Sequence, residues 1–214
     1  MLYFWIFAIE LLFLFFLSHE VTKACSRVFS LYLLAFLFFP GTLLHELAHY
    51  FMALILFVPV GHMEFIPKVH GTSVKLGSVM IGKTDPFRRA LIGLAPLFGG
   101  LVCLLGAIYY FSSFPLQIWI LNILLLLFIV FEISNTMFSS RRDVEGIPAL
   151  LAVISIFVIS AWILDIRIPE PIVTYVSSIT FQTFFQQLSL YLLIPLGLDG
   201  GILLFSRLME SRQR

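Results

Sequence analysis

The chain has little charge and almost no cysteine. Only 12% of its 214 residues are Asp, Glu, Lys or Arg, and the formal net charge is +1. This balance supplies no basic surface for a phosphate backbone, so we expect no nucleic-acid partner. The two cysteines, Cys25 and Cys103, lie far apart in the chain and make no disulfide framework. The first apolar run also lacks a basic leader and a small-x-small cleavage site, which predicts a retained membrane helix rather than a signal peptide.

Apolar residues dominate instead. Residues of hydrophobic type make up 60% of the chain, and 24 of them are Phe. That composition excludes a soluble globular domain. Several runs reach or approach the roughly 20 apolar residues that cross a bilayer. We therefore predict an all-α polytopic protein of the cell membrane, built as one membrane-embedded domain over residues 1–214 with its core at 28–165.

The apolar runs predict about six transmembrane helices. A polar stretch at residues 18–23 is expected to separate the first two spans. Pro40-Gly41 should break the second span, since Pro suits the first turn of a new helix. The six expected spans cover residues 1–17, 27–58, 88–111, 115–136, 147–164 and 184–206.

Residues 60–86 differ in composition from the rest of the chain. They contain lysines and four glycines between short β-prone pieces, and residues 72–76 alternate polar and apolar after a turn at His70-Gly71. We predict a small β-hairpin at the membrane surface.

Basic residues sort unevenly across the six expected spans. Ten fall on one side and three on the other, which predicts that the hairpin and both termini are cytoplasmic. The larger group is Lys68, Lys75, Lys83, Arg88, Arg89, Arg141, Arg142, Arg207, Arg212 and Arg214, and the smaller is Lys23, Arg27 and Arg167.

An HExxH motif at His45, Glu46 and His49 lies inside an apolar run. On a helix, residues four apart lie about 40° apart around the axis, so both imidazoles can bind one metal ion. Glu46 can then serve as general base for a water molecule at that metal. The alternative is a pair of hydrogen-bonded core histidines, but three ionisable side chains at membrane depth are costly without a function.

A catalytic zinc ion bound by two histidines needs a third protein ligand. Asp143 and Asp199 are both candidates, and the residues alone leave the choice open. If it is not a ligand, Asp143 is a loop acid that balances the charge of neighbouring arginines, and Asp199 is an acid near a helix end. Asn135 either binds substrate or caps a helix. Glu10 and Glu132 are also membrane-embedded, and we expect them to pair locally rather than contact zinc.

In this order along the chain, the motifs resemble the site-two protease family of intramembrane zinc metalloproteases. The resemblance covers residues 40–146. It consists of the HExxH helix, a β-hairpin, a helix that opens with Arg88-Arg89-Ala90-Leu91-Ile92-Gly93-Leu94-Ala95-Pro96, and an Asn eight residues before an Asp, here Asn135 and Asp143. The resemblance implies Zn²⁺ bound by His45, His49 and Asp143, with Asn135 as a substrate-binding residue.

Two features depart from the family pattern. Phe138 stands where the family usually has Pro, and Asp143 is not preceded by Leu or followed directly by Gly. A closer Leu-Asp-Gly-Gly phrase surrounds Asp199, although Tyr191 occupies the place of the expected Asn.

These observations predict a zinc metalloendopeptidase in the lipid bilayer that cleaves a membrane protein or peptide near the cytoplasmic face. An alternative is a non-proteolytic membrane zinc protein, such as a scaffold or transporter, that retains the motif, because a motif does not establish activity. A third hypothesis is the hydrolysis of a lipid or isoprenoid.

Overall fold

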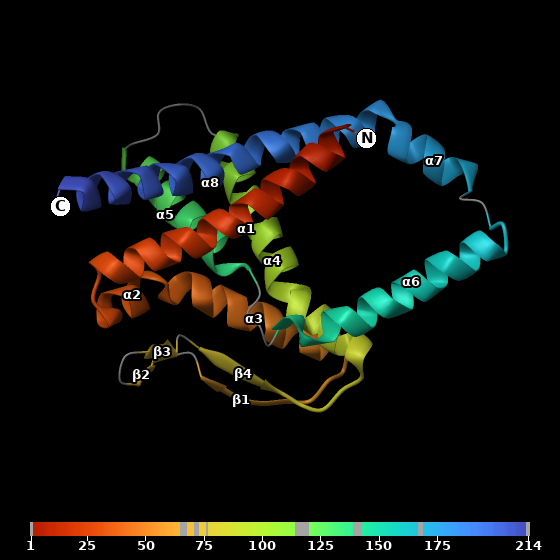
Figure 1. Ribbon diagram of the computed structural model, residues 1–214, viewed down its shortest axis with the longest axis horizontal. Coiled ribbons are helices and arrows are strands. Elements are labelled where there is room, and N and C mark those ends of the chain that lie inside the picture. The colour runs from red at the N-terminus through yellow and green to blue at the C-terminus, as the bar shows by residue number, and fades with distance from the viewer. Residues whose placement is uncertain are drawn as a thin grey trace.

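The computed structural model describes residues 2–64, 68–70, 73–75, 77–113, 120–138, 143–166 and 169–212. This part of the chain is mostly helical, with four short strands between α3 and α4 (Figure 1). The helices are α1 Leu2–Val28, α2 Leu31–Leu37, α3 Phe39–Ile55, α4 Pro86–Ser112, α5 Ile120–Thr136, α6 Ile147–Ile163, α7 Glu170–Ser177 and α8 Ile179–Arg212, with a 3₁₀ turn, η1, at Asp143–Gly146.

Helix α1 is longer than we expected. It runs unbroken for 27 residues, so the polar stretch at residues 18–23 is helical and does not connect two spans. The helix accommodates these residues because their hydroxyls bond within it. Ser18 Oγ donates to the carbonyl of Phe15, and Thr22 Oγ1 donates to the carbonyl of Ser18. The ammonium of Lys23 pairs with Glu20 one turn away, at 2.6 Å.

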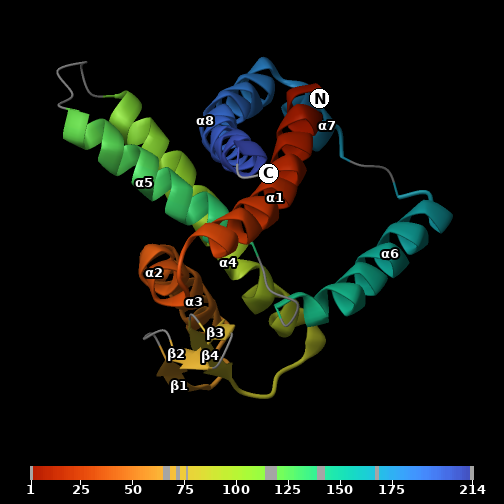
Figure 2. The ribbon, with the colours of Figure 1, turned by 60° about the vertical axis from the view of Figure 1, so that its left-hand side comes forward.

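Helices α1 and α8 pack side by side and run in the same direction (Figures 1 and 2). Their C-terminal ends meet around a hollow of about 210 Å³, where Lys23 and Arg27 lie beside Arg207. The prediction that Lys23 and Arg27 lie on the opposite side of the membrane from Arg207 is therefore wrong. It assumed that α1 ends before the polar stretch. If both helices cross the bilayer, the two termini lie on opposite faces, contrary to the predicted arrangement.

The six predicted spans are not confirmed. Within the described residues, α1, α4 and α8 are long and apolar enough to cross a membrane, and the bent pair α2–α3 makes a possible fourth. Helices α5 and α6 are apolar but have only 17 residues each. Helix α8 begins at Ile179 rather than at residue 184. Pro115, Arg141, Arg142, Arg167 and Arg214, on which the span and charge predictions also drew, lie outside the described residues.

The predicted break before the HExxH motif is confirmed. Helices α2 and α3 meet at Phe38 with a bend of 58°. Pro40 lies in the first turn of α3, where its missing N–H costs nothing, whereas inside a continuous helix it would remove a hydrogen bond. The motif therefore begins just inside a new helix.

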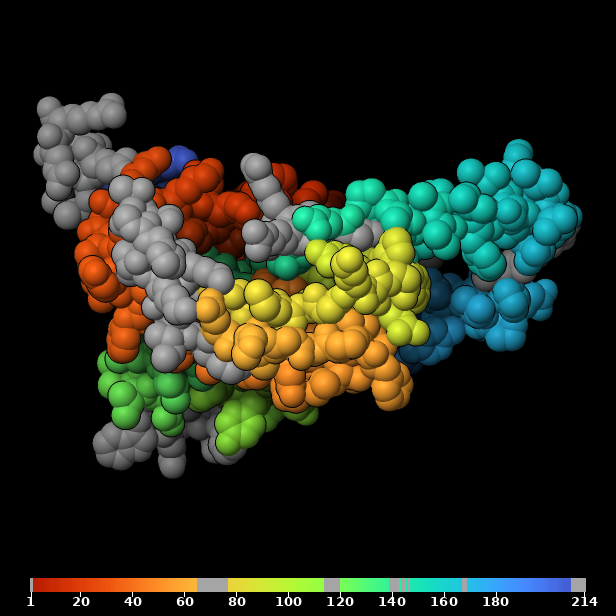
Figure 3. Space-filling view, turned by 90° about the horizontal axis from the view of Figure 1, so that it is seen from below, coloured from red at the N-terminus to blue at the C-terminus, as the bar shows by residue number. Residues whose placement is uncertain are grey.

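Four strands form two antiparallel pairs below α3 (Figure 1). Strand β1 Val60–Glu64 pairs with β4 Ser78–Ile81, and β2 Lys68–His70 pairs with β3 Ser73–Lys75 within that loop. The hairpin predicted for residues 60–86 is present in this nested form. Its expected turn at His70-Gly71 falls partly outside the described residues. Figure 3 shows β1, β4 and the start of α4 on the lower face, next to the start of α6.

The largest buried cluster joins α1, α4, α5 and α8. It comprises Phe7, Leu14, Leu104, Ile108, Val130, Ile133, Met137 and Leu192. Small residues on α4 allow the helices to approach closely, since Gly99 lies next to the Cβ of Ala48 and Gly100 directly against Met137. By contrast, α6 and α7 have no buried residues and extend away from this body (Figures 1 and 2).

Candidate metal centre

The two histidines of the motif face one another on α3. The ring centroids of His45 and His49 are 4.8 Å apart, and their Nε2 atoms are 3.1 Å apart. Both side chains are largely buried, with 12% and 5% of their surface exposed. The helical spacing of four residues therefore places two imidazole nitrogens at one point, as the sequence predicts.

Backbone carbonyls orient both rings. His45 Nδ1 donates to the carbonyl of Thr136 at 2.7 Å, and His49 Nδ1 donates to the carbonyl of Ile92 at 2.8 Å. A carbonyl oxygen only accepts, so each Nδ1 carries a proton. Each Nε2 is then the atom with a lone pair for a metal. The first acceptor lies at the end of α5 and the second on α4.

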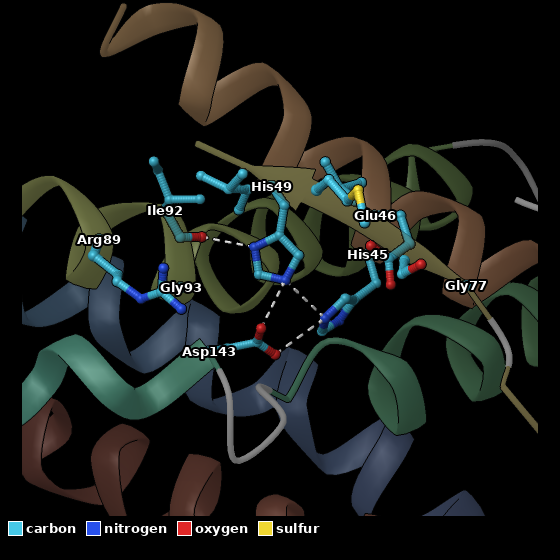
Figure 4. A pocket seen from close by; sticks show the side chains of 12 residues that line it. His45, Glu46, His49, Gly77, Arg89, Ile92, Gly93 and Asp143 are labelled. Carbon is cyan, nitrogen blue, oxygen red and sulfur yellow. Dashed lines mark hydrogen bonds and ion pairs between the residues drawn. The ribbon is translucent and has the colours of Figure 1, made fainter. Parts of the chain in front are cut away.

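Asp143 joins the histidines from η1. Its Oδ1 lies 3.3 Å from Nε2 of His49, and its Oδ2 lies 3.6 Å from Nε2 of His45 (Figure 4). One ligand atom from each residue falls within 4.8 Å of the others, so the three side chains could hold a metal ion. Two imidazoles and one carboxylate match the donor set of catalytic zinc sites, which keep a fourth position open.

Helix α4 determines where η1 lies. The carbonyl of Asp143 sits against Gly93 so closely that a Cβ at this position would overlap it. A neighbouring ion pair joins the same elements, because Arg89 Nη2 lies 2.9 Å from Oε2 of Glu145. The missing side chain at Gly93 therefore lets the loop bring the Asp143 carboxylate to α3.

The three clustered side chains line a cavity of about 460 Å³, and Glu46 lies on the wall of this cavity as well. The wall also includes Arg89 and residues 77–81 at β4 (Figure 4). A Cβ at Gly77, the residue before β4, would come within 3.0 Å of Glu46 Cγ, so the chain lies directly against this side chain where it enters the strand. Glu46 thus shares a cavity with the candidate ligands without belonging to their cluster.

The other candidate ligand, Asp199, lies in a different place. It is fully buried on α8, and its Oδ1 accepts a hydrogen bond from Asn135 Nδ2 at 3.0 Å. Among the described residues, neither Asp199 nor Asn135 belongs to the metal cluster or lines the cavity. The structure therefore brings together the three side chains that the family resemblance implies as ligands, whereas Asn135 contacts Asp199 instead of lining the cavity.

Several residues of the site escaped the sequence analysis. The carbonyls of Thr136 and Ile92 carry no side-chain signal, because any residue could supply them. Gly93 belongs to the motif of the family resemblance at residues 88–96, but the sequence did not indicate that it packs against Asp143. Glu132 was expected to pair locally, yet it bonds to α3 at Gly41. Only its position as an acid in an apolar run pointed to a role.

Comparison of the chain with known protein families, with curated proteins and with solved structures found no match.

Proposed function

We propose that the protein is an intramembrane zinc metalloendopeptidase that cleaves a membrane-associated polypeptide near the cytoplasmic face. The observation that carries the proposal is the shared cavity. His45, His49 and Asp143 form a cluster that could hold a metal, and Glu46 lines the same space without joining the cluster. This arrangement separates ligands from base, as zinc peptidases require.

Each residue has a separate role in the proposed reaction. Zinc bound here would supply Lewis-acid chemistry, polarising a scissile carbonyl and activating water for attack. His45, His49 and Asp143 bind and orient the ion. Glu46 takes the proton from the attacking water and passes it to the leaving amine. The general base must lie within hydrogen-bonding reach of that water, and Glu46 lines the cavity that also contains the three proposed ligands.

The wall formed by β4 supports a peptide rather than a lipid substrate. Strand β4 pairs with β1, and residues 77–81 line the cavity. An extended backbone beside a strand edge can form main-chain hydrogen bonds to it. A helical substrate has to unwind first, since its carbonyls are otherwise bonded within the helix. Arg89 lines the cavity, and Lys83 and Arg88 are close to lining residues in the sequence; these three basic residues favour a cytoplasmic location.

The test is Glu46→Gln in the full-length protein. Loss of a general base lowers the rate by about 10²–10⁴-fold. The variant should keep its zinc, because Glu46 lies outside the ligand cluster, whereas His49→Ala should lose it. Cleavage of a membrane substrate and zinc content are measured on the same preparations. Cleavage by Glu46→Gln at the parent rate would refute the mechanism. Zinc binding without any Glu46-dependent cleavage would favour a non-proteolytic zinc protein.

A further inference from the structure

Glu132 is a buried carboxylate on the apolar helix α5. Only 2% of its surface is exposed. Its Oε2 accepts a hydrogen bond from the backbone N–H of Gly41 at 2.9 Å, whereas Oε1 has no hydrogen-bond partner among the described residues. An acidic side chain in an apolar helix is costly to bury, so this contact calls for a function.

The contact caps the helix that carries the HExxH motif. Gly41 lies in the first turn of α3, where backbone N–H groups have no acceptor within the helix. Phe38, the residue before α3, provides no side-chain cap. Glu132 instead supplies the acceptor from a second helix, and a carboxylate is favoured at the positive end of the helix dipole.

The capping hydrogen bond and the hydrogen bond of His45 both join α3 to α5, and they lie one helical turn apart. Gly41 meets Glu132, and one turn later His45 donates to the Thr136 carbonyl; both pairs are 91 residues apart in the chain. The two helices approach each other closely at Gly41. A Cβ at Gly41 would collide with the Thr136 side chain and come within 2.7 Å of the Glu132 carbonyl oxygen.

We propose that Glu132 is a positioning residue of the metal centre. By accepting the Gly41 N–H, it holds α3 and α5 in the register that places the Thr136 carbonyl at His45 Nδ1. This bond directs His45 Nε2 towards the metal. His49 is held separately by Ile92 of α4. The inference rests on metal binding by the cluster and does not require that the protein is a peptidase.

The experiment compares three substitutions of Glu132 in the purified full-length chain, with Zn²⁺ and Co²⁺ as probes. Glu132→Gln keeps an acceptor oxygen at the same reach. Glu132→Asp keeps the charge but is one methylene shorter, and Glu132→Leu removes the acceptor. We expect Glu132→Leu and Glu132→Asp to weaken metal affinity by about 10–100-fold, as loss of a ligand-orienting partner does, and Glu132→Gln to stay within a few-fold of the parent. The Co²⁺ absorption bands report the ligand geometry directly.

Glu10→Leu is the matched control. Glu10 is another carboxylate on an apolar helix, α1; its Oε2 is buried with no partner among the described residues, and it belongs to neither the cluster nor the cavity lining. We expect this variant to bind both metals like the parent. Parent-like affinity and Co²⁺ bands in Glu132→Leu and Glu132→Asp would overturn the proposal. Equal impairment of Glu132→Gln and Glu132→Leu would do so as well. If Glu132→Leu does not fold, the comparison of Glu132→Asp with Glu132→Gln decides. Cleavage assays on Glu46→Gln test the proposed function independently.

Discussion

Asp143 and Asp199 have the same side chain but opposite surroundings. Asp143 lies in a short turn at the edge of a cavity, with 16% of its side chain exposed, and meets two imidazoles. Asp199 lies inside α8 with no exposed surface and meets the amide of Asn135. The Asp143 carboxylate is therefore accessible from the cavity, whereas the Asp199 carboxylate is buried between helices and has no access to solvent.

The comparison shows that a local phrase does not predict which aspartate lies with His45 and His49. Asp199 has the closer Leu-Asp-Gly-Gly sequence, but a Cβ added at Gly200 or Gly201 would meet no other element of the described chain within 4 Å, so neither glycine permits a close approach there. At Asp143 the close approach is made by Gly93, which lies 50 residues earlier on another helix. The glycine that matters for the site is near in space and distant in sequence.

The largest expected difference between the two carboxylates is in metal affinity. Asp143→Ala removes a proposed ligand, so we expect the affinity for Zn²⁺ to fall by more than the roughly 10–100-fold that loss of an outer partner causes. Asp199→Ala should bind Zn²⁺ within a few-fold of the parent. Equilibrium dialysis followed by elemental analysis measures both. The reverse pattern would reassign the third ligand to Asp199.

A smaller effect is expected where α4 supports Asp143. Gly93→Ala places a methyl group against the Asp143 carbonyl, which has to move together with its carboxylate. We expect Zn²⁺ affinity to fall by about tenfold, in the range for displaced supporting contacts. Gly106→Ala on the same helix is the control, because its added Cβ meets no other element of the described chain within 4 Å. Unchanged affinity in Gly93→Ala would show that the loop is not positioned by this contact.

The smallest effect is expected on stability, when the buried hydrogen bond between Asn135 and Asp199 is changed. Asp199→Asn keeps an acceptor for Asn135, so the free energy of unfolding should change by about 1 kcal/mol or less. Asp199→Leu leaves the Asn135 amide buried without that acceptor and should cost about 1–3 kcal/mol. Denaturant unfolding in detergent distinguishes the two variants. A loss of stability in Asp199→Asn as large as in Asp199→Leu would mean that the charge matters, and not the hydrogen bond.

Local physical chemistry made part of this molecule predictable. Helical periodicity alone places His45 and His49 on one face, and the missing N–H of Pro40 separates α3 from α2. Alternation and glycines indicated the strands between α3 and α4. The polar residues after Leu17 misled the prediction, because hydroxyls that bond to carbonyls of their own helix leave α1 intact. This error also put Lys23 and Arg27 in the wrong charge group.

The apolar helices, the broken helix and the paired imidazoles with Glu46 beside them could be predicted from the residues alone, because each depends on residues within a few turns of one another. The aspartate that completes the cluster, the carbonyls that orient the rings and the partner of Glu132 could be identified only from the folded chain. Those contacts join residues many positions apart, such as His45 with Thr136 and Gly41 with Glu132. They depend on how closely α3, α4 and α5 approach, and that distance is determined by packing between helices rather than by the pattern within any one of them.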